Sequence, residues 1–355
     1  MSQADHEDIS TGSSRPAEHR HLFGHQEAQH AFLSAVAGNR LPHAWLISGP
    51  SGVGKATLAY AMARLMLSGS LSTVVNEAAQ ALDTTSGLAR ISLDEAIAAR
   101  IAVGSHGDLL VVDRGFDEKR QRERTEIPVD QIRRIIPFMQ STAAEGGWRV
   151  VIVDGADTMN RSAQNALLKG LEEPPNHTLL LLLADRPERL LPTVKSRCRQ
   201  LVLSPLSDQE MTTALSELLG ASASDLSSIL PLSGGCPGEA MRIVQADIHG
   251  LWASLQLILE RDGQASNVNA RELPALATSI ANDPTRWQYF GRLLRHWLHD
   301  RAKALAIDAT PGIGPLDQPF AMWDKISRHL AEADQRNLDR RLVALQILEQ
   351  LRRAA

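Results

Sequence analysis

Several residue types are scarce in this sequence, and each scarcity excludes a class of protein. The 355 residues contain two cysteines, which excludes a disulfide-stapled fold and a zinc site built from several thiolates. Lysine and arginine (37) are outnumbered by aspartate and glutamate (41), and the net charge of −4 excludes a uniformly basic nucleic-acid coat. Apolar runs are too short to cross a bilayer, and the polar first twenty residues contain no apolar signal segment. We therefore expect a cytoplasmic protein that makes no contact with a membrane.

The chain nevertheless has enough apolar residues, 43%, to form packed cores, and its length predicts two or three domains. Residues 1–20 have almost nothing to bury and are expected to form a disordered leader. In residues 21–205, strand-like runs at 44–47, 109–112, 149–153, 179–183 and 201–203 alternate with helical segments that include 129–139, 162–171 and 187–194. This alternation predicts an α/β domain with a parallel sheet covered on both faces. Residues 68–105, rich in alanine, serine and threonine, are expected to be an insertion with short helices.

After residue 205 the strand signals stop and helical patterns follow. Ser207 has the character of an N-cap, with Glu210 three residues later completing a capping box. We expect a small helical domain at 206–247 and a larger all-α domain at 248–355. In the latter, two apolar stripes predict a bundle core: Trp287, Phe290, Leu294, Trp297 and Leu298, and Leu338, Leu342, Leu345 and Leu348.

A dense run of charges occupies residues 114–126. Its signs are nearly balanced and it has no apolar face, which favours a solvated loop. The alternative is a basic tip that contacts DNA through Arg120, Arg122 and Arg124.

The strongest chemical signal is a glycine-rich phosphate loop between a predicted strand and a predicted helix. Glycines allow successive backbone N–H groups to converge on phosphate oxygens, the helix N-terminus favours negative charge, and Lys55 is expected to reach the β- and γ-phosphates. The predicted nucleotide-binding residues are Gly49, Pro50, Ser51, Gly52, Val53, Gly54, Lys55, Ala56 and Thr57, together with Asp154 at the end of the strand at 149–153. The alternative is a glycine-rich turn without a ligand.

Two departures from the motif predict poor hydrolysis. Ala56 stands where a serine or threonine holds Mg²⁺, and Thr57 is rotated by about 100° on the helix. Gly155 follows Asp154, whereas hydrolysing enzymes of the AAA+ class place a second acid there to polarise the attacking water. A positioned general base is worth roughly 10²–10⁴ in rate. We therefore expect that the chain can bind ATP but hydrolyses it poorly, and that it holds magnesium weakly.

Downstream motifs carry a family resemblance. Residues 165–175 read NALLKGLEEPP, residues 187–191 read PERLL, and Ser196, Arg197 and Cys198 form an SRC triplet. With the phosphate loop, these motifs resemble the AAA+ clamp-loader subunits of bacterial replicative polymerases, most closely the delta-prime class. The motifs cover about residues 22–241, and the C-terminal third resembles the family by architecture alone. The implied fold is a P-loop domain followed by a small helical lid and an all-α collar.

The resemblance implies a role in a five-membered hetero-oligomeric ring that loads a sliding clamp on primed DNA. The other subunits would be motor and delta-type subunits. In this family the SRC arginine faces the ATP of a neighbouring subunit, which implies that Arg197 acts in trans, with interface residues Ser196, Cys198, Leu168, Glu172 and Pro174. An arginine finger supplied in trans is worth roughly 10³–10⁵ in rate. The alternative is that Arg197 only pairs with a structural carboxylate.

Other positions depart from hydrolysing relatives. Ala184 and Asp185 stand where a polar sensor residue ends a strand, and Gly238 stands where a sensor arginine is expected, with Arg242 a turn later. Many delta-prime relatives carry a four-cysteine zinc module after the first helix, but this stretch has no cysteine, so no zinc is expected. The resemblance thus implies a non-catalytic, stator-like subunit.

Two other functions would account for part of these motifs. An active motor ATPase of the same family would need Thr57 to bind metal and an acid such as Asp157 to replace the missing base. A small-molecule phosphotransferase would explain the phosphate loop but neither the NALLKGLEEPP nor the SRC motif.

Overall fold

The computed structural model describes residues 16–19, 22–69, 71–82, 88, 95–117, 122–145, 147–219, 229–259, 272–308, 317–336 and 338–354. The chain divides into two compact units, an N-terminal unit (Met1–Leu226 with Gly234–Glu239) and a C-terminal unit (Ser227–Ser233 with Ala240–Ala355). The expected division of the helical part into a lid and a collar stays a prediction.

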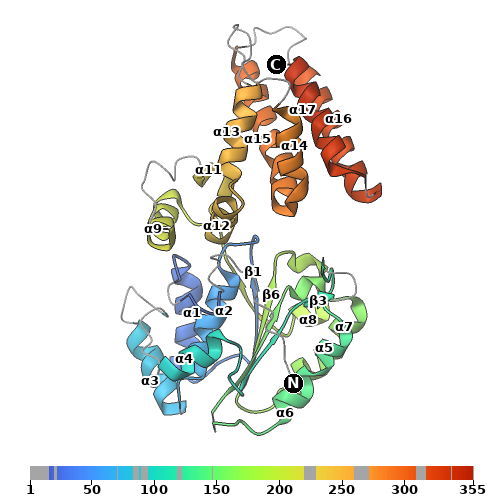
Figure 1. Ribbon diagram of the computed structural model, residues 1–355. Helices are drawn as coiled ribbons and strands as arrows, with labels where there is room; N and C mark the ends of the chain where they lie inside the picture. Colours follow the sequence, from blue (N-terminus) through green and yellow to red (C-terminus); the bar gives the residue numbers. More distant parts are fainter. Residues whose placement is uncertain are drawn as a thin grey trace, which may run out of the picture. The chain divides into compact units, whose positions relative to one another are not determined.

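A five-stranded sheet forms the centre of the N-terminal unit (Figure 1). Its strands are all parallel and lie in the order β2-β5-β6-β1-β7. Their bounds are β1 Ala44–Ser48, β2 Leu109–Val112, β5 Arg149–Asp154, β6 Thr178–Ala184 and β7 Arg199–Val202. The predicted parallel α/β architecture is confirmed.

Helices cover both faces of this sheet (Figure 1). Because both faces are covered, every residue of β6 is buried, with Leu179, Leu181 and Leu183 in one core and Leu180 and Leu182 in the other. The first core takes side chains from α1 Gln26–Ala37, α2 Lys55–Met66, α3 Leu71–Leu82 and α4 Glu95–Ala102. The second takes them from α5 Val129–Arg133, α6 Ile135–Gln140, α7 Arg161–Glu172 and α8 Pro192–Lys195.

The structure corrects two expected helices. The segment at 129–139 is broken at Arg134 into α5 and α6, because Pro137 has no N–H to continue the α-helical ladder. The segment at 187–194 consists of a 3₁₀ turn, η3 (Pro187–Arg189), and the short α8, each begun by a proline. Proline disfavours helical backbone in the residue before it, which separates the two.

Parts of the expected leader and insertion are integral to the N-terminal unit. Ala17 is buried, and the Arg64 guanidinium donates to the His19 carbonyl at 2.7 Å. The rest of the expected leader, except Glu18 and Pro16, lies outside the described residues. Helices α3 and α4 lie within the expected insertion and contribute buried residues such as Val74 and Ile101 to the core.

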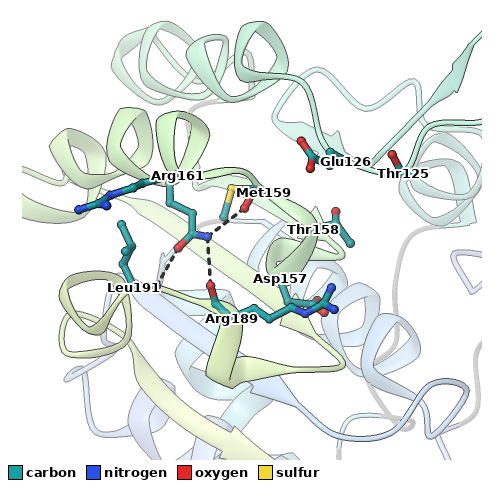
Figure 2. Close-up of a pocket in the computed structure, with 9 residues that line it drawn as sticks. Thr125, Glu126, Asp157, Thr158, Met159, Arg161, Arg189 and Leu191 are labelled. Carbon is teal, nitrogen blue, oxygen red and sulfur yellow. Dashed lines mark hydrogen bonds between the residues drawn. The ribbon is translucent and has the colours of Figure 1, made fainter.

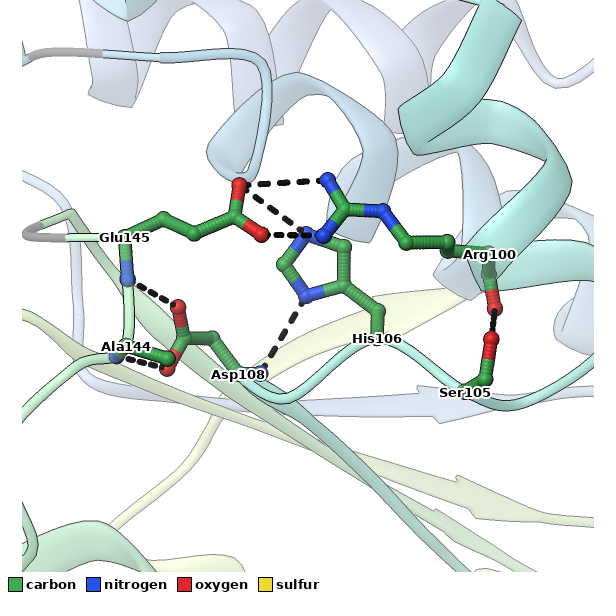
Figure 3. A network of polar contacts seen from close by, with 6 residues as sticks. All are labelled: Arg100, Ser105, His106, Asp108, Ala144 and Glu145. Atoms are coloured by element: carbon green, nitrogen blue, oxygen red, sulfur yellow. Dashed lines mark hydrogen bonds and ion pairs between the residues drawn. The ribbon is translucent and has the colours of Figure 1, made fainter.

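A polar network joins the loops that precede β2 and β5 (Figure 3). The buried carboxylate of Asp108 accepts hydrogen bonds from the backbone N–H groups of Ala144 (2.7 Å) and Glu145 (3.1 Å). Glu145 pairs with Arg100, and its carboxylate lies 3.8 Å from Nε2 of the buried His106. The network links the loops at the amino-terminal ends of β2 and β5, whereas the phosphate loop follows the carboxyl-terminal end of β1.

The charged run at 114–126 contains a short antiparallel pair, β3 Phe116–Asp117 and β4 Arg122–Glu123. Its described flanks, including Arg114 and Arg124, are exposed, as expected for a solvated segment. Arg120 lies outside the described residues, and a contact of this run with DNA stays a prediction.

The remaining elements are helical. In the N-terminal unit, 3₁₀ turn η2 (Ala156–Thr158) follows β5. Helix α9 (Asp208–Leu219) starts with the predicted capping box, in which the Ser207 N–H donates to Glu210 Oε2 (2.9 Å) and the Glu210 N–H donates to Ser207 Oγ (3.4 Å). Helix α12 (Pro237–Gln245) begins in the N-terminal unit and ends in the C-terminal one. The others are α11 Leu230–Ser233, α13 Ile248–Leu259, α14 Leu273–Asn282, α15 Pro284–Asp308, α16 Asp317–Arg336 and α17 Arg340–Ala354.

One predicted stripe in the C-terminal unit is largely confirmed, and the other is wrong at Leu338 and Leu342 but right at Leu348, which is buried. On α15, the members Trp287, Phe290, Leu294 and Leu298 are buried, while Trp297 is half-buried. On α17, Leu342 is 62% exposed and the preceding Leu338 is 44% exposed. The buried face is formed by Val343, Ala344, Ile347, Leu348 and Leu351. The prediction chose a face displaced by about one residue, or 100°.

Candidate functional site

The phosphate loop lies at the carboxyl edge of the sheet, between β1 and α2. Helix α2 begins at Lys55, after Gly54 in a left-handed conformation with φ of 116°. Gly49 has φ of 154°, and a Cβ there would lie 2.5 Å from the Leu203 carbonyl oxygen. The glycines therefore permit the tight strand-to-helix turn that the motif predicts.

Lys55 points back into its own loop. Its Nζ donates to the carbonyl oxygens of Gly49 (2.9 Å) and Pro50 (2.8 Å), and it lies 2.6 Å from Oδ1 of Asp185. A lysine ammonium has three N–H donors. All three have partners within the chain, and the side chain is only 8% exposed.

Strand order explains why Asp185 reaches Lys55. β1 and β6 are neighbours, and Ser48 is in register with Ala184. Gly49 and Asp185 therefore leave the sheet at the same level, and the Gly49 N–H donates to the Ala184 carbonyl at 3.3 Å. The sequence placed Asp185 one residue beyond the expected sensor position but did not predict this ion pair.

Two further contacts brace the phosphate loop. Nε2 of His25 lies 2.9 Å from the Val53 carbonyl oxygen, and the Gly238 N–H donates to the Gly52 carbonyl at 2.9 Å. A Cβ at residue 238 would lie 3.0 Å from Gly52 Cα, so glycine allows the close approach. Burial lowers the pKa of His25, while its bond to Val53 raises it. Sequence reasoning missed His25 because the contact spans 28 residues.

Asp154 ends β5, as predicted, close to the phosphate loop. The residue is exposed, but the surrounding protein still desolvates its carboxylate and raises its pKa. The charge of Lys55 opposes this rise, and the nearby carboxylates of Asp113 and Asp185 add to it. Three acids thus lie at the carboxyl ends of three adjacent strands, and two of them, Asp154 and Asp185, are close to Lys55.

The residues around Asp154 contradict one requirement of the motor alternative. Asp157 is 8% exposed, and its two carboxylate oxygens accept hydrogen bonds from the backbone N–H groups of Asp185 (3.2 Å) and Arg186 (3.3 Å). It therefore serves as a link between two loops and is not free to act as a base. Gly155 adopts φ of 78°, a conformation that a glutamate would adopt only with strain.

The NALLKGLEEPP and SRC motifs meet at the surface. Arg197 pairs with Glu172, at the end of α7, with 2.8 Å between guanidinium and carboxylate. The side chains are 36% and 50% exposed, respectively. Arg197 also donates to the Thr193 carbonyl at 2.9 Å. The structure thus brings together Arg197 and Glu172, which the resemblance assigns to one interface.

The other expected interface residues differ in exposure. Ser196 is exposed, and Leu168 and Pro174 are half-buried. Cys198 is buried, and this burial raises its pKa to about 12. A thiol with such a pKa is protonated at neutral pH, so Cys198 packs as a small apolar residue.

Gln164 organises the start of α7, where a pocket of about 520 Å³ lies (Figure 2). Its Nε2 donates to the carbonyls of Met159 (2.9 Å) and Arg189 (3.3 Å), and its Oε1 accepts from the Leu191 N–H (2.7 Å). These bonds tie the PERLL segment to α7. The sequence contained no signal for this role.

The motifs that meet in this site also occur together in a known protein family. The family described as "DNA polymerase III, delta subunit" matches residues 24–207, which include the phosphate loop, the NALLKGLEEPP motif and the SRC triplet. This range covers more than half of the chain.

The chain belongs to the DNA polymerase III delta subunit family.

Two curated relatives agree with this membership. The chain is 36% identical over 217 residues to DNA polymerase III subunit delta' of Pseudomonas aeruginosa, a match that covers 61% of this chain and 60% of the relative. It is 29% identical over 286 residues to the delta' subunit of Escherichia coli, covering 79% of this chain and 78% of the relative. The expected resemblance to the delta-prime class is confirmed.

A solved structure supports the fold. A DNA polymerase III gamma subunit-related protein from Thermotoga maritima aligns with 92% of this chain and 99% of its own, with a TM-score of 0.50 and 21% identity. At this identity the likeness shows the fold alone, an AAA+-like parallel α/β architecture with many helices. Within the described residues, no helix combines the length and apolarity needed to cross a membrane.

Proposed function

We propose that this chain is the stator-like delta-prime subunit of a clamp loader, which takes part in ATP-dependent loading of the sliding clamp in DNA replication. In this role it presents Arg197 to ATP held by a neighbouring subunit and hydrolyses little or no ATP itself. Its membership of the family and its similarity to delta-prime subunits support the role.

The observation that carries the proposal is the exposed pair between Arg197 and Glu172. A guanidinium that is 36% exposed can exchange a surface carboxylate for a phosphate, because surface pairs of this kind are worth only about 0–1 kcal/mol. Arginine also offers paired N–H donors that match phosphate oxygens. Glu172 therefore holds Arg197 in position at the surface without burying it.

The proposed partners follow from the family. Motor and delta-type subunits complete a ring of five, in which Leu168, Glu172, Pro174, Ser196 and Cys198 contribute to one wall of a neighbour's ATP site. The sliding clamp and primed DNA engage the assembled complex, in the cytoplasm. Helices of the C-terminal unit form the collar that joins the subunits.

The chain's own loop is proposed to bind ATP weakly, to hold magnesium poorly and to use no zinc. Ala56 lacks the hydroxyl that would coordinate magnesium. Gly155 occupies the place of the second acid with a backbone that disfavours one, and Lys55 is engaged by Gly49, Pro50 and Asp185.

The decisive experiment reconstitutes the loader with Arg197→Ala and measures DNA- and clamp-stimulated ATP turnover. The proposal predicts a loss of roughly 10³-fold or more at the neighbouring site. Arg199→Ala, which removes an exposed arginine two residues away, is the matched control and should stay within about twofold of wild type. Turnover within about twofold for Arg197→Ala as well would refute the trans-acting arginine.

A second measurement separates the stator from the motor alternative. The purified chain is titrated with the fluorescent nucleotide mant-ATP, with and without Mg²⁺, and its ATP turnover is measured. The stator role predicts weak mant-ATP binding that does not depend on magnesium, and negligible ATP turnover. Strong magnesium dependence, with turnover that Lys55→Ala abolishes, would establish a motor instead.

A further inference from the structure

We propose that Asp185 is an internal counter-ion that occupies Lys55 in place of a nucleotide phosphate and keeps the phosphate loop of this chain in a low-affinity state. The inference rests on the proposed function, in which this loop is a weak nucleotide site, and it identifies the residue that sets the affinity.

The geometry of Lys55 is the first support. Its ammonium approaches two loop carbonyls and Oδ1 of Asp185, so all three of its N–H donors are used. A β- or γ-phosphate can reach the ammonium only if one of these partners leaves. The carboxylate is the one partner on a side chain, and at 48% exposure it lies on the solvent side of the 8% exposed lysine.

The position of Asp185 is the second support. The carboxylate is held near Lys55 by its backbone, because the Asp185 N–H donates to the buried Asp157 and β6 is in register with β1. A phosphate entering the loop would meet this negative charge at close range, and like charges at such a distance repel. Asp185 therefore acts twice, by occupying the donor and by repelling the ligand.

The bracing of the loop is the third support. Carbonyl oxygens of Gly49, Pro50, Gly52 and Val53 all have partners within the chain, from Lys55, Gly238 and His25. These bonds hold the loop backbone in one shape, so the ion pair between Lys55 and Asp185 is the contact that an incoming phosphate has to displace.

Equilibrium titration of the purified full chain with mant-ATP tests this inference. Asp185→Asn keeps the size of the side chain and removes its charge, and it should tighten binding at least about tenfold, equivalent to about 1.4 kcal/mol. Asp113→Asn is the matched control, because Asp113 also lies near Asp154 but its Oδ1 accepts from the Gly115 N–H. It should change the affinity less than about threefold.

A double variant shows whether the gain passes through Lys55. In a Lys55→Ala background, Asp185→Asn should tighten binding clearly less than it does beside Lys55, because only the direct repulsion of the phosphate is then relieved. An unchanged or weakened affinity in Asp185→Asn, an equal gain in Asp113→Asn, or a gain that is as large in the Lys55→Ala background would each overturn the inference. Loss of loader turnover in Arg197→Ala is independent of these outcomes, so the two proposals fail separately.

Discussion

Arg197 and Glu172 form an ion pair of 2.8 Å that joins the two sequence motifs on which the family resemblance depends. Glu172 is the last residue of α7, and Arg197 follows α8 directly after Ser196. Because both side chains remain partly exposed, the pair keeps a guanidinium available at the surface of the N-terminal unit. The proposed function and the first prediction both follow from this arrangement.

Breaking this pair should cost the fold of the chain little. Glu172→Gln is expected to lower the free energy of unfolding by less than about 1 kcal/mol, because exposed ion pairs contribute little. Urea unfolding of the purified chain measures this change, with Glu173→Gln as a control for the same loss of charge one residue away. A loss above about 2 kcal/mol would show that Arg197 and Glu172 serve the fold of this chain.

Restoring the missing acid should not restore hydrolysis. Gly155→Glu is expected to leave ATP turnover negligible and to destabilise the chain by about 1–2 kcal/mol, because residue 155 has φ of 78°. Gly155→Asn should cost less, since asparagine tolerates left-handed backbone better than glutamate. Equal destabilisation by the two variants, or ATP turnover in Gly155→Glu, would contradict this account.

Acid should destabilise the N-terminal unit partly through His106 (Figure 3). Burial lowers the pKa of His106 below its ordinary value of 6.5, as does Arg100, while Glu145 and Asp108 oppose the shift. Below about pH 6.5, His106 therefore binds a proton more readily in the unfolded chain than in the folded chain. The free energy of unfolding falls as the pH falls. Urea unfolding between pH 7.5 and pH 5, as rough limits, should show a shallower decline for His106→Gln than for wild type.

His25 provides the comparison for this measurement, because burial lowers its pKa as well. His106→Gln should therefore remove only part of the decline. An unchanged pH profile in His106→Gln would show that His106 does not titrate differently in the folded and unfolded chain.

The buried face of α17 can be tested by two truncations. Ile347→Ala should lower the free energy of unfolding by about 2–5 kcal/mol, because Ile347 is fully buried. Leu342→Ala should change it by no more than about 0.5 kcal/mol, because Leu342 is 62% exposed. Urea unfolding of both variants measures these changes, and the reverse order of effects would restore the stripe that the sequence predicted.

Local patterns predicted much of the N-terminal unit. The strands at 109–112 and 149–153, the helix at 162–171 and the phosphate loop were all recognisable, because each depends on residues close together in the chain. The same holds for Ala56 and Gly155, whose departures from the motif are visible in the sequence. The sequence predictions were wrong where the apolar pattern was weak, as on α17, and where a proline interrupted a helical pattern, as at Pro137.

The sequence by itself determined that this chain has a phosphate loop without a magnesium ligand or a second acid, and that it carries the family's SRC triplet. Only the tertiary structure decided which residues these groups meet. Asp185 reaches Lys55 because β6 lies beside β1, and Glu172 reaches Arg197 because α7 ends near the turn after α8. Strand order and helix packing depend on burial summed over the whole unit, and no local stretch of residues encodes them.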